Sequence, residues 1–325
     1  MKICIVGAGA IGGMLAVRLA EAGAHVSVIA RGTQLQAIQT KGLTLIEADG
    51  QEKNARFEAS SRITDMPGQD AIILAVKAHQ LADASFGVAQ MLSDDGVIVT
   101  AQNGIPFWYF FGQHDSPANR PIRAVDPDGR ITSLLPTDKI IGSVVYPAAE
   151  IVAPGVIRHI EGLRFSLGEL DGSSSERANR VSNVLRAAGF KAPVVRDIRS
   201  EIWTKLWGNL AFNPISALTR ADLAAICADP DTRALATEMM REAQAIAEQL
   251  GIQFKITIEK RLMGAAEVGA HKTSMLQDLE AGRALETEAL IGAVAELGRL
   301  VQVPSPHIDS VLASLRLLAR TTLPS

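Results

Sequence analysis

The feature that most constrains the fold of this chain is a short glycine-rich stretch near its start. The apolar run ICIV (3–6) leads into GAGAIG (7–12), and GGMLAVRLAEAG (12–23) then follows a helical pattern. Glycines in the order GxGxxG allow a tight turn, the close approach of a pyrophosphate to the backbone, and close packing of the helix on the strand. We therefore expect a strand, a turn and a helix that bind a dinucleotide through the loop residues Gly7, Ala8, Gly9, Ala10, Ile11 and Gly12. The alternative is a tight structural turn without a ligand.

The first hundred residues alternate between short β-branched runs and helical patterns. The runs at 25–29, 71–76 and 96–100 resemble strands buried on both faces, as parallel strands are. The Asp49-Gly50 pair within residues 43–57 predicts a small hairpin. Strands and helices in this order predict a doubly wound, mostly parallel α/β sheet.

After residue 140 the pattern changes. Strand-like runs, a helical pattern and a last expected strand follow one another at 140–148, 155–160, 163–170, 174–190 and 192–198. Beyond them, long helical patterns cover residues 200–226, 231–250, 273–300 and 306–319. We expect an α/β, Rossmann-like domain at 1–197 and an all-α domain at 198–325.

Composition excludes several classes of protein. The chain is 47% hydrophobic and 21% charged with a formal net charge of −3, so no overall basic field attracts nucleic acid or anionic lipid. The glycines of the first helix argue against a secretion signal, and no apolar run is long enough to span a membrane. Cys4 and Cys227 sit among apolar residues without metal-ligand spacing, so we expect reduced core cysteines in a cytoplasmic protein.

The end of the second strand indicates which nucleotide binds. NAD-binding proteins usually carry an acidic residue there for the ribose hydroxyls. This chain instead has Ala30-Arg31-Gly32-Thr33, a cation between small residues that suits a 2′-phosphate. NADP(H) is therefore favoured, with an ordinary surface arginine as the alternative. Lys77 and Asn103-Gly104 follow two further strands, at the edge of a parallel sheet where ligands bind, although each alone could be a surface residue.

Three polar side chains are spaced four residues apart in the apolar segment EIWTKLWGNLAFNP (201–214). Lys205, Asn209 and Asn213 would share one face of a helix, and burying that face without partners would be costly. A cleft between the two domains would satisfy them, and a lysine there could act as a general acid. Alternatively, the lysine extends from a buried helix to solvent and the amides pair with nearby backbone.

A second segment, residues 271–294, combines a helix start with a carboxylate. Ser274 and Gln277 fit a capping box. Glu286 lies three turns further on, beside apolar residues. It could be a buried carboxylate that receives a hydrogen bond from a substrate hydroxyl, or it could pair with Arg283 on a solvated face.

Taken together, these segments resemble the ketopantoate reductases (2-dehydropantoate 2-reductases). The resemblance covers most of both expected domains, in the same order, at residues 7–12, 30–43, 76–80, 102–105, 203–218 and 274–288. It implies reduction of 2-dehydropantoate to (R)-pantoate with NADPH, in pantothenate biosynthesis. It also implies a Rossmann-like domain and a helical domain with the active site between them.

The resemblance implies a role for each matching residue. Lys205 would protonate the ketone oxygen as the hydride arrives, and Glu286 would help to hold the lysine and the substrate hydroxyl. Asn209, Asn213 and Ser274 would bind the substrate, with Ser274 near its carboxylate. Asn103 would line both the cofactor site and the substrate site, Lys77 the cofactor site, and Arg31 would contact the 2′-phosphate.

One segment departs from the family's usual pattern. Residues 106–130 form a long link that opens with five consecutive aromatic residues, from Phe107 to Phe111. This link could be a lid that reshapes the pocket, or a loop packed on its own aromatics or at a subunit interface.

Two further functions stay open besides the reduction of 2-dehydropantoate. They are the reduction of a different 2-oxo acid and a non-catalytic NADP-binding role. A homodimer is possible, and the expected partner is a small-molecule 2-oxo acid.

Overall fold

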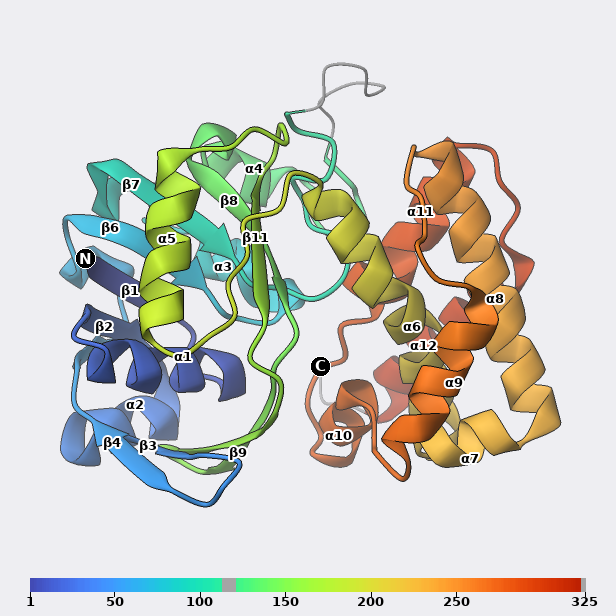
Figure 1. The fold of residues 1–325 in the computed structure, drawn as a ribbon, viewed down its shortest axis with the longest axis horizontal. Coiled ribbons are helices and arrows are strands. Elements are labelled where there is room, and N and C mark those ends of the chain that lie inside the picture. The colour runs from blue at the N-terminus through green and yellow to red at the C-terminus, as the bar shows by residue number, and fades with distance from the viewer. Residues whose placement is uncertain (113–120, 323–325) are drawn as a thin grey trace. The chain divides into compact units, whose positions relative to one another are not determined.

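The computed structural model describes residues 1–112 and 121–322 (Figure 1). Its contacts divide the chain into two compact units. We call the first the nucleotide unit; it comprises Met1–Gln102, Phe107–Pro121 and Asp128–Ile198. We call the second the helical unit; it comprises Asn103–Pro106, Ile122–Pro127 and Arg199–Ser325. Two short stretches from the middle of the chain therefore pack with the C-terminal helices.

A seven-stranded sheet forms the centre of the nucleotide unit. Its strand order is β11-β8-β7-β6-β1-β2-β5, and every neighbouring pair is parallel except β8 and β11. The strands are β1 (Lys2–Val6), β2 (His25–Ile29), β5 (Glu58–Ser60), β6 (Gln69–Leu74), β7 (Leu92–Thr100), β8 (Ile140–Val145) and β11 (Phe165–Glu169). The inner strands are apolar and buried, as is typical of parallel strands covered by helices.

A smaller sheet of four strands packs on the first helix of this unit. Its order is β4-β3-β10-β9, from β3 (Leu43–Ile46), β4 (Glu52–Ala55), β9 (Ala148–Ala153) and β10 (Val156–Glu161). The expected hairpin around Asp49-Gly50 is the antiparallel pair of β3 and β4. Helix α1 (Ala10–Glu21) lies so close to β10 that a Cβ at Gly13 would be 2.7 Å from the Ile157 side chain.

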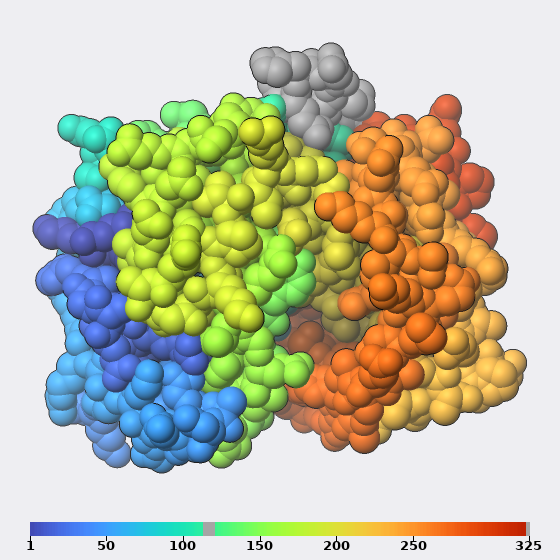
Figure 2. Space-filling model, viewed as in Figure 1, coloured from blue at the N-terminus to red at the C-terminus, as the bar shows by residue number. Residues whose placement is uncertain are grey.

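The other helices of the nucleotide unit are α2 (Gly32–Lys41), α3 (Leu81–Ala84), α4 (Arg130–Leu134) and α5 (Glu176–Ala187). Helix α5 starts at Ser175, whose hydroxyl accepts the backbone N–H of Ala178. Its apolar face contributes Ala178, Val181 and Leu185 to the core. In the space-filling view, the yellow-green segment that includes α5 lies on the front of this unit, above the blue N-terminal residues (Figure 2).

The helices of the helical unit are α6 (Ile198–Thr219, which starts at the last residue of the nucleotide unit), α7 (Leu223–Ala228), α8 (Pro230–Gln249), α9 (Ile258–Val268), α10 (Ser274–Glu280), a π-helical turn (Glu288–Gly292), α11 (Ala293–Leu300) and α12 (Pro306–Thr322). Helix α6 is held by fully buried Trp203 and Trp207, and the indole of Trp207 donates to the Met240 carbonyl at 2.8 Å. A mostly parallel α/β sheet followed by α-helices confirms the expected fold class. Within the described residues, no helix has the length and hydropathy needed to cross a membrane.

Three details differ from the sequence expectations. The expected strand at 192–198 is a single isolated bridge from Val194 to Leu167 of β11, since Pro193 has no N–H to donate to a ladder. The expected helix at 200–226 is interrupted at Arg220, which has φ +63°. The expected helix at 273–300 stops after Glu280 and resumes at residue 287, so Glu286 lies in the interruption and not within a helix.

Candidate functional site

The glycine loop joins β1 to α1 as expected from the motif. Gly7 has φ +100°, and a Cβ there would lie 2.7 Å from the Val76 side chain, so the turn requires glycine. At Gly12 a Cβ would lie 1.9 Å from the Gly7 carbonyl oxygen, so helix and turn can approach only without a side chain. Contacts within the protein therefore account for glycine at both Gly7 and Gly12.

Gly9 is different, because no contact in the part of the chain that the structure describes requires glycine at this position. Its φ of −70° suits any residue, and a Cβ there would have no neighbour within 4 Å. Gly9 also caps α1 without a side-chain hydrogen bond, which leaves the first N–H groups of the helix available. Open space over a helix N-terminus fits the pyrophosphate of a dinucleotide, which needs close contact with the backbone.

The other residues expected to bind the nucleotide lie at the carboxyl ends of neighbouring strands. Arg31 is exposed just after β2, where it starts α2 in an extended conformation, and no carboxylate occupies residues 30–33. Lys77 follows β6 and is partly buried. The guanidinium and the ammonium are cations that can pair with phosphate groups.

Two glutamines that the sequence analysis did not single out fix the backbone of this region. Gln34 Nε2 donates to the Ala8 carbonyl of the glycine loop at 2.8 Å. Gln102 Nε2 donates to the Leu74 and Val76 carbonyls at 2.7 and 3.1 Å, which ties the end of β7 to the segment before Lys77. Position at the end of a strand is the signal that could have identified Gln102; Gln34 lies inside α2, where no local signal distinguishes it.

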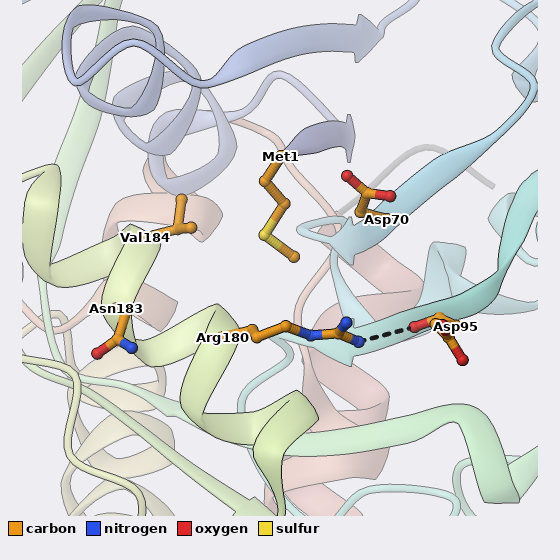
Figure 3. Close-up of a pocket in the computed structure, with 6 residues that line it drawn as sticks. All are labelled: Met1, Asp70, Asp95, Arg180, Asn183 and Val184. Atoms are coloured by element: carbon orange, nitrogen blue, oxygen red, sulfur yellow. Dashed lines mark hydrogen bonds between the residues drawn. The ribbon is translucent and has the colours of Figure 1, made fainter.

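A pocket of about 380 Å³ lies at the opposite, amino-terminal edge of the sheet, away from these residues (Figure 3). It is lined by residues from the starts of β1, β6 and β7 and from α5, and the Arg180 guanidinium donates to the Asp95 carbonyl at 3.2 Å. In open α/β sheets ligands bind at the carboxyl ends of the strands, so we do not assign the nucleotide to this pocket.

In the helical unit, three of the expected site residues meet. The Lys205 ammonium donates to Asn103 Oδ1 at 2.6 Å, and Asn103 Nδ2 lies 3.4 Å from Glu286 Oε2. An ammonium group can only donate and a carboxylate can only accept, so the amide must turn its oxygen to the lysine and its NH₂ to the glutamate. Asn103 thereby connects the possible acid to a carboxylate that is only 6% exposed.

The two amides of α6 continue the row from Lys205. Asn209 is partly buried, and Asn213 is 5% exposed. Among the described residues, neither side chain has a hydrogen-bond partner, so the alternative in which they pair with nearby backbone is not observed. Buried amides are normally hydrogen-bonded, so these two groups are available to a polar ligand.

Two expectations about the second segment need correction. The residue that caps α10 is Thr273, whose hydroxyl accepts the Leu276 N–H, and Ser274 is the exposed first residue of the helix. Ser274 makes no hydrogen bond with another described residue. Arg283 pairs with Asp278 at 2.9 Å rather than with Glu286, so the solvated-face interpretation of Glu286 is wrong.

The aromatic run belongs to the core of the nucleotide unit. Phe107, Trp108, Tyr109 and Phe110 are each at most 2% exposed. The Trp108 indole donates to the Thr100 hydroxyl at 2.9 Å, and the rings of Tyr109 and Phe110 meet edge to face. These contacts favour the interpretation as a packed loop; residues 113–120 of the link lie outside the described residues.

Comparison with known proteins agrees with this arrangement. A family model described as "Ketopantoate reductase PanE/ApbA" matches residues 3–172, and one for the C-terminal part of the same family matches residues 197–319. The chain belongs to the ketopantoate reductase family. The two matches together span both the glycine loop and the polar row of α6.

Individual ketopantoate reductases extend the match. A 2-dehydropantoate 2-reductase of Mesorhizobium japonicum is 55% identical over 98% of both chains, and one of Archaeoglobus fulgidus is 31% identical over 91% of this chain and 90% of its own. A crystal structure from Ralstonia solanacearum, assigned provisionally as a ketopantoate reductase, has a TM-score of 0.94 with 41% identity over 98% of both chains. The family resemblance expected from the sequence is therefore confirmed.

Proposed function

We propose that this ketopantoate reductase reduces 2-dehydropantoate to (R)-pantoate with NADPH, with Lys205 as the general acid. The observation that carries the proposal is the group formed by Lys205, Asn103 and Glu286. Two further amides on the helix of Lys205 have no hydrogen-bond partner among the described residues. An amine, a carboxylate and free amides suit a substrate that carries a ketone, a hydroxyl and a carboxylate. This substrate is the one named for the two relatives above.

The reduction needs a hydride on the ketone carbon and a proton on the ketone oxygen. When bound, NADPH would supply the hydride, and the glycine loop, Arg31 and Lys77 would hold it. Lys205 transfers one proton from its ammonium group to the developing alkoxide, and the amine is reprotonated from solvent before the next turnover. The alcohol product carries the hydride, with its two electrons, and the proton. The lysine that gave the proton is left neutral. The proposal needs a nicotinamide held by the glycine loop to reach Lys205 during turnover.

The neighbours of Lys205 prepare it for this step. Asn103 accepts a hydrogen bond from the ammonium and so directs it, and the Glu286 carboxylate orients the amide from its other end. With its remaining acceptor capacity, Glu286 receives the substrate hydroxyl. Asn209 and Asn213 bind the polar groups of the substrate, and Ser274 stays a proposed contact to its carboxylate.

NADPH is proposed over NADH because Arg31 stands where an acidic residue would contact the ribose hydroxyls of NADH. The glycine loop and Lys77 complete the nucleotide site. We further propose that the protein is cytoplasmic, since its two cysteines are free and buried, and that it works without nucleic acid, as a monomer or a homodimer.

Product analysis tests the proposed reaction. The purified chain is incubated with 2-dehydropantoate and NADPH, NADPH oxidation is followed by absorbance, and the product is identified by chiral chromatography with mass spectrometry. We expect one (R)-pantoate for each NADPH oxidised. If NADPH binds but is not oxidised, the proposal is wrong, and the chain either reduces a different 2-oxo acid or binds NADP(H) without catalysis.

A further inference from the structure

The loop that carries Asn103 is seated on the backbone of the helical unit through the two residues after it. The Ile105 N–H donates to the Ala289 carbonyl at 2.9 Å, and the Ile105 side chain is 1% exposed. Gly104, between Asn103 and Ile105, has φ +86°, and a Cβ on this residue would lie 2.3 Å from the Ala289 carbonyl oxygen. Backbone cannot move aside as the end of a flexible side chain can, so this contact requires glycine.

Ala289 lies in the π-helical turn Glu288–Gly292, and Glu286 lies two residues before that turn. The turn is also held from its outer side, because the Arg316 guanidinium of α12 donates to both oxygens of Glu288 at 2.7 and 2.5 Å. The same short segment therefore presents Glu286 and receives the loop of Asn103. Single π-helical turns of this kind recur at functional sites.

We propose that the contact between Gly104 and the Ala289 carbonyl is a positioning element, which sets where Asn103 stands between Lys205 and Glu286. This inference rests on the proposed function. Gly104 has no side chain that could contact a substrate, and it acts through Asn103. The contact of Asn103 with Glu286 is already long at 3.4 Å, so a small displacement of the loop breaks it.

The first test compares two glycine substitutions in the helical unit. Gly104→Ala places a Cβ against Ala289, whereas Gly251 has a similar φ of +83° with nothing within 4 Å of a Cβ. Both variants carry the same type of backbone strain, and only Gly104→Ala displaces the loop. A misplacement of about 1 Å can lower a rate about 10²-fold. We expect a kcat loss of this order in Gly104→Ala and near wild-type kcat in Gly251→Ala.

A double variant separates positioning from general damage to the fold. Asn103→Ala alone should lower kcat and change its pH profile, and adding Gly104→Ala should change neither any further. The inference would be overturned if the losses in kcat from Asn103→Ala and Gly104→Ala added up in the double variant. It would also be overturned if Gly104→Ala had the same kcat and pH profile as Gly251→Ala. Arg316→Gln, which only loosens the turn, should shift kcat in the same direction to a smaller extent, and it serves if Gly104→Ala does not fold.

Crystal structures of the variants test the inference without turnover. We expect the distance from Asn103 Oδ1 to Lys205 Nζ to exceed 3.5 Å in Gly104→Ala, or in Arg316→Gln in its place, and to stay near 2.6 Å in Gly251→Ala. An unchanged distance in the loop variant overturns the positioning role even if the enzyme proves active. A wild-type chain that is inactive on 2-dehydropantoate would instead contradict the proposed function. The distance from Asn103 Oδ1 to Lys205 Nζ in the variants would then still decide the positioning role of Gly104.

Discussion

At the scale of single residues, the account depends on Lys205 being an acid and not only a positive charge. Lys205→Arg keeps the charge and the donor to Asn103, but a guanidinium does not release its proton in proteins. We expect Lys205→Ala and Lys205→Arg both to lower kcat by about 10²- to 10⁴-fold, the usual contribution of general acid catalysis. NADPH affinity, measured by fluorescence titration, should stay unchanged.

The control for this prediction is Lys260→Ala, which removes an exposed lysine from α9 of the same unit. Its kcat should match that of the wild type. An active Lys205→Arg variant would mean that the residue acts only electrostatically, and another proton donor would have to be found.

A substitution of Arg31 tests the proposed preference for NADPH over NADH. Removing a charged hydrogen-bond partner of a phosphate typically costs about 1.5–3 kcal/mol. Arg31→Ala should therefore raise the KM for NADPH about tenfold or more and leave the KM for NADH nearly unchanged. Arg62→Ala, which removes another exposed arginine of the nucleotide unit, is the matched control. An equal rise for both nucleotides would place the 2′-phosphate contact elsewhere.

At the scale of elements, a buried ion pair joins the small sheet to α1. Arg18 of α1 donates to Glu47, just after β3, and Lys53 of β4 lies 3.3 Å from the same carboxylate. Burial alone would raise the pKa of Glu47, but the hydrogen bonds and charges of Arg18 and Lys53 hold it below its usual value of 4.5. A lowered folded-state pKa stabilises the fold above pH 4.5, and this contribution is lost as the pH falls through the folded-state pKa.

Glu47→Gln tests this pair. At pH 7 we expect the free energy of unfolding to fall by about 2 kcal/mol, as for a lost hydrogen bond to a charged group. The difference from wild type should shrink as the pH falls below 4.5, because the wild-type carboxylate then becomes neutral as well. Urea titrations between pH 3 and 7 measure this, with Glu150→Gln in the exposed pair with Arg158 as the control. A difference that stays constant over this range would contradict the account.

A helix or strand could be predicted from the sequence where the residues that determine it lie close together in the chain. β2 begins and ends where the β-branched run HVSVI (25–29) does, because its buried residues at 26–29 follow one another without a break. The long expected helix at 273–300 was wrong because the turn at 281–286 is held by contacts such as Arg283 with Asp278, which sequence spacing alone leaves undecided. Thr273 and Ser274 are both good caps, and only the structure distinguishes them.

At the scale of the whole molecule, the least predictable feature is that the helical unit includes short stretches from the middle of the chain. Asn103 lies three residues after the end of β7, and local pattern assigns it to the edge of the sheet, yet its loop packs on the turn at Ala289. Residues 122–127 join the same unit, where the Glu296 carboxylate accepts the N–H groups of Arg123 and Ala124 at 3.0 and 2.7 Å. The spacing on α6 could predict the polar row, but not that Asn103 would link Lys205 to Glu286.

The most direct test of the central claim is a comparison of kcat/KM for 2-dehydropantoate and a panel of other 2-oxo acids, each with NADPH and with NADH. Groups placed for the hydroxyl of one substrate discriminate strongly against analogues that lack it, since the buried polar groups are then left unpaired. We expect 2-dehydropantoate with NADPH to give the highest kcat/KM, by about 10²-fold or more over 2-oxo acids without the hydroxyl. An equal or higher value for one of those acids, or for NADH, would contradict the account.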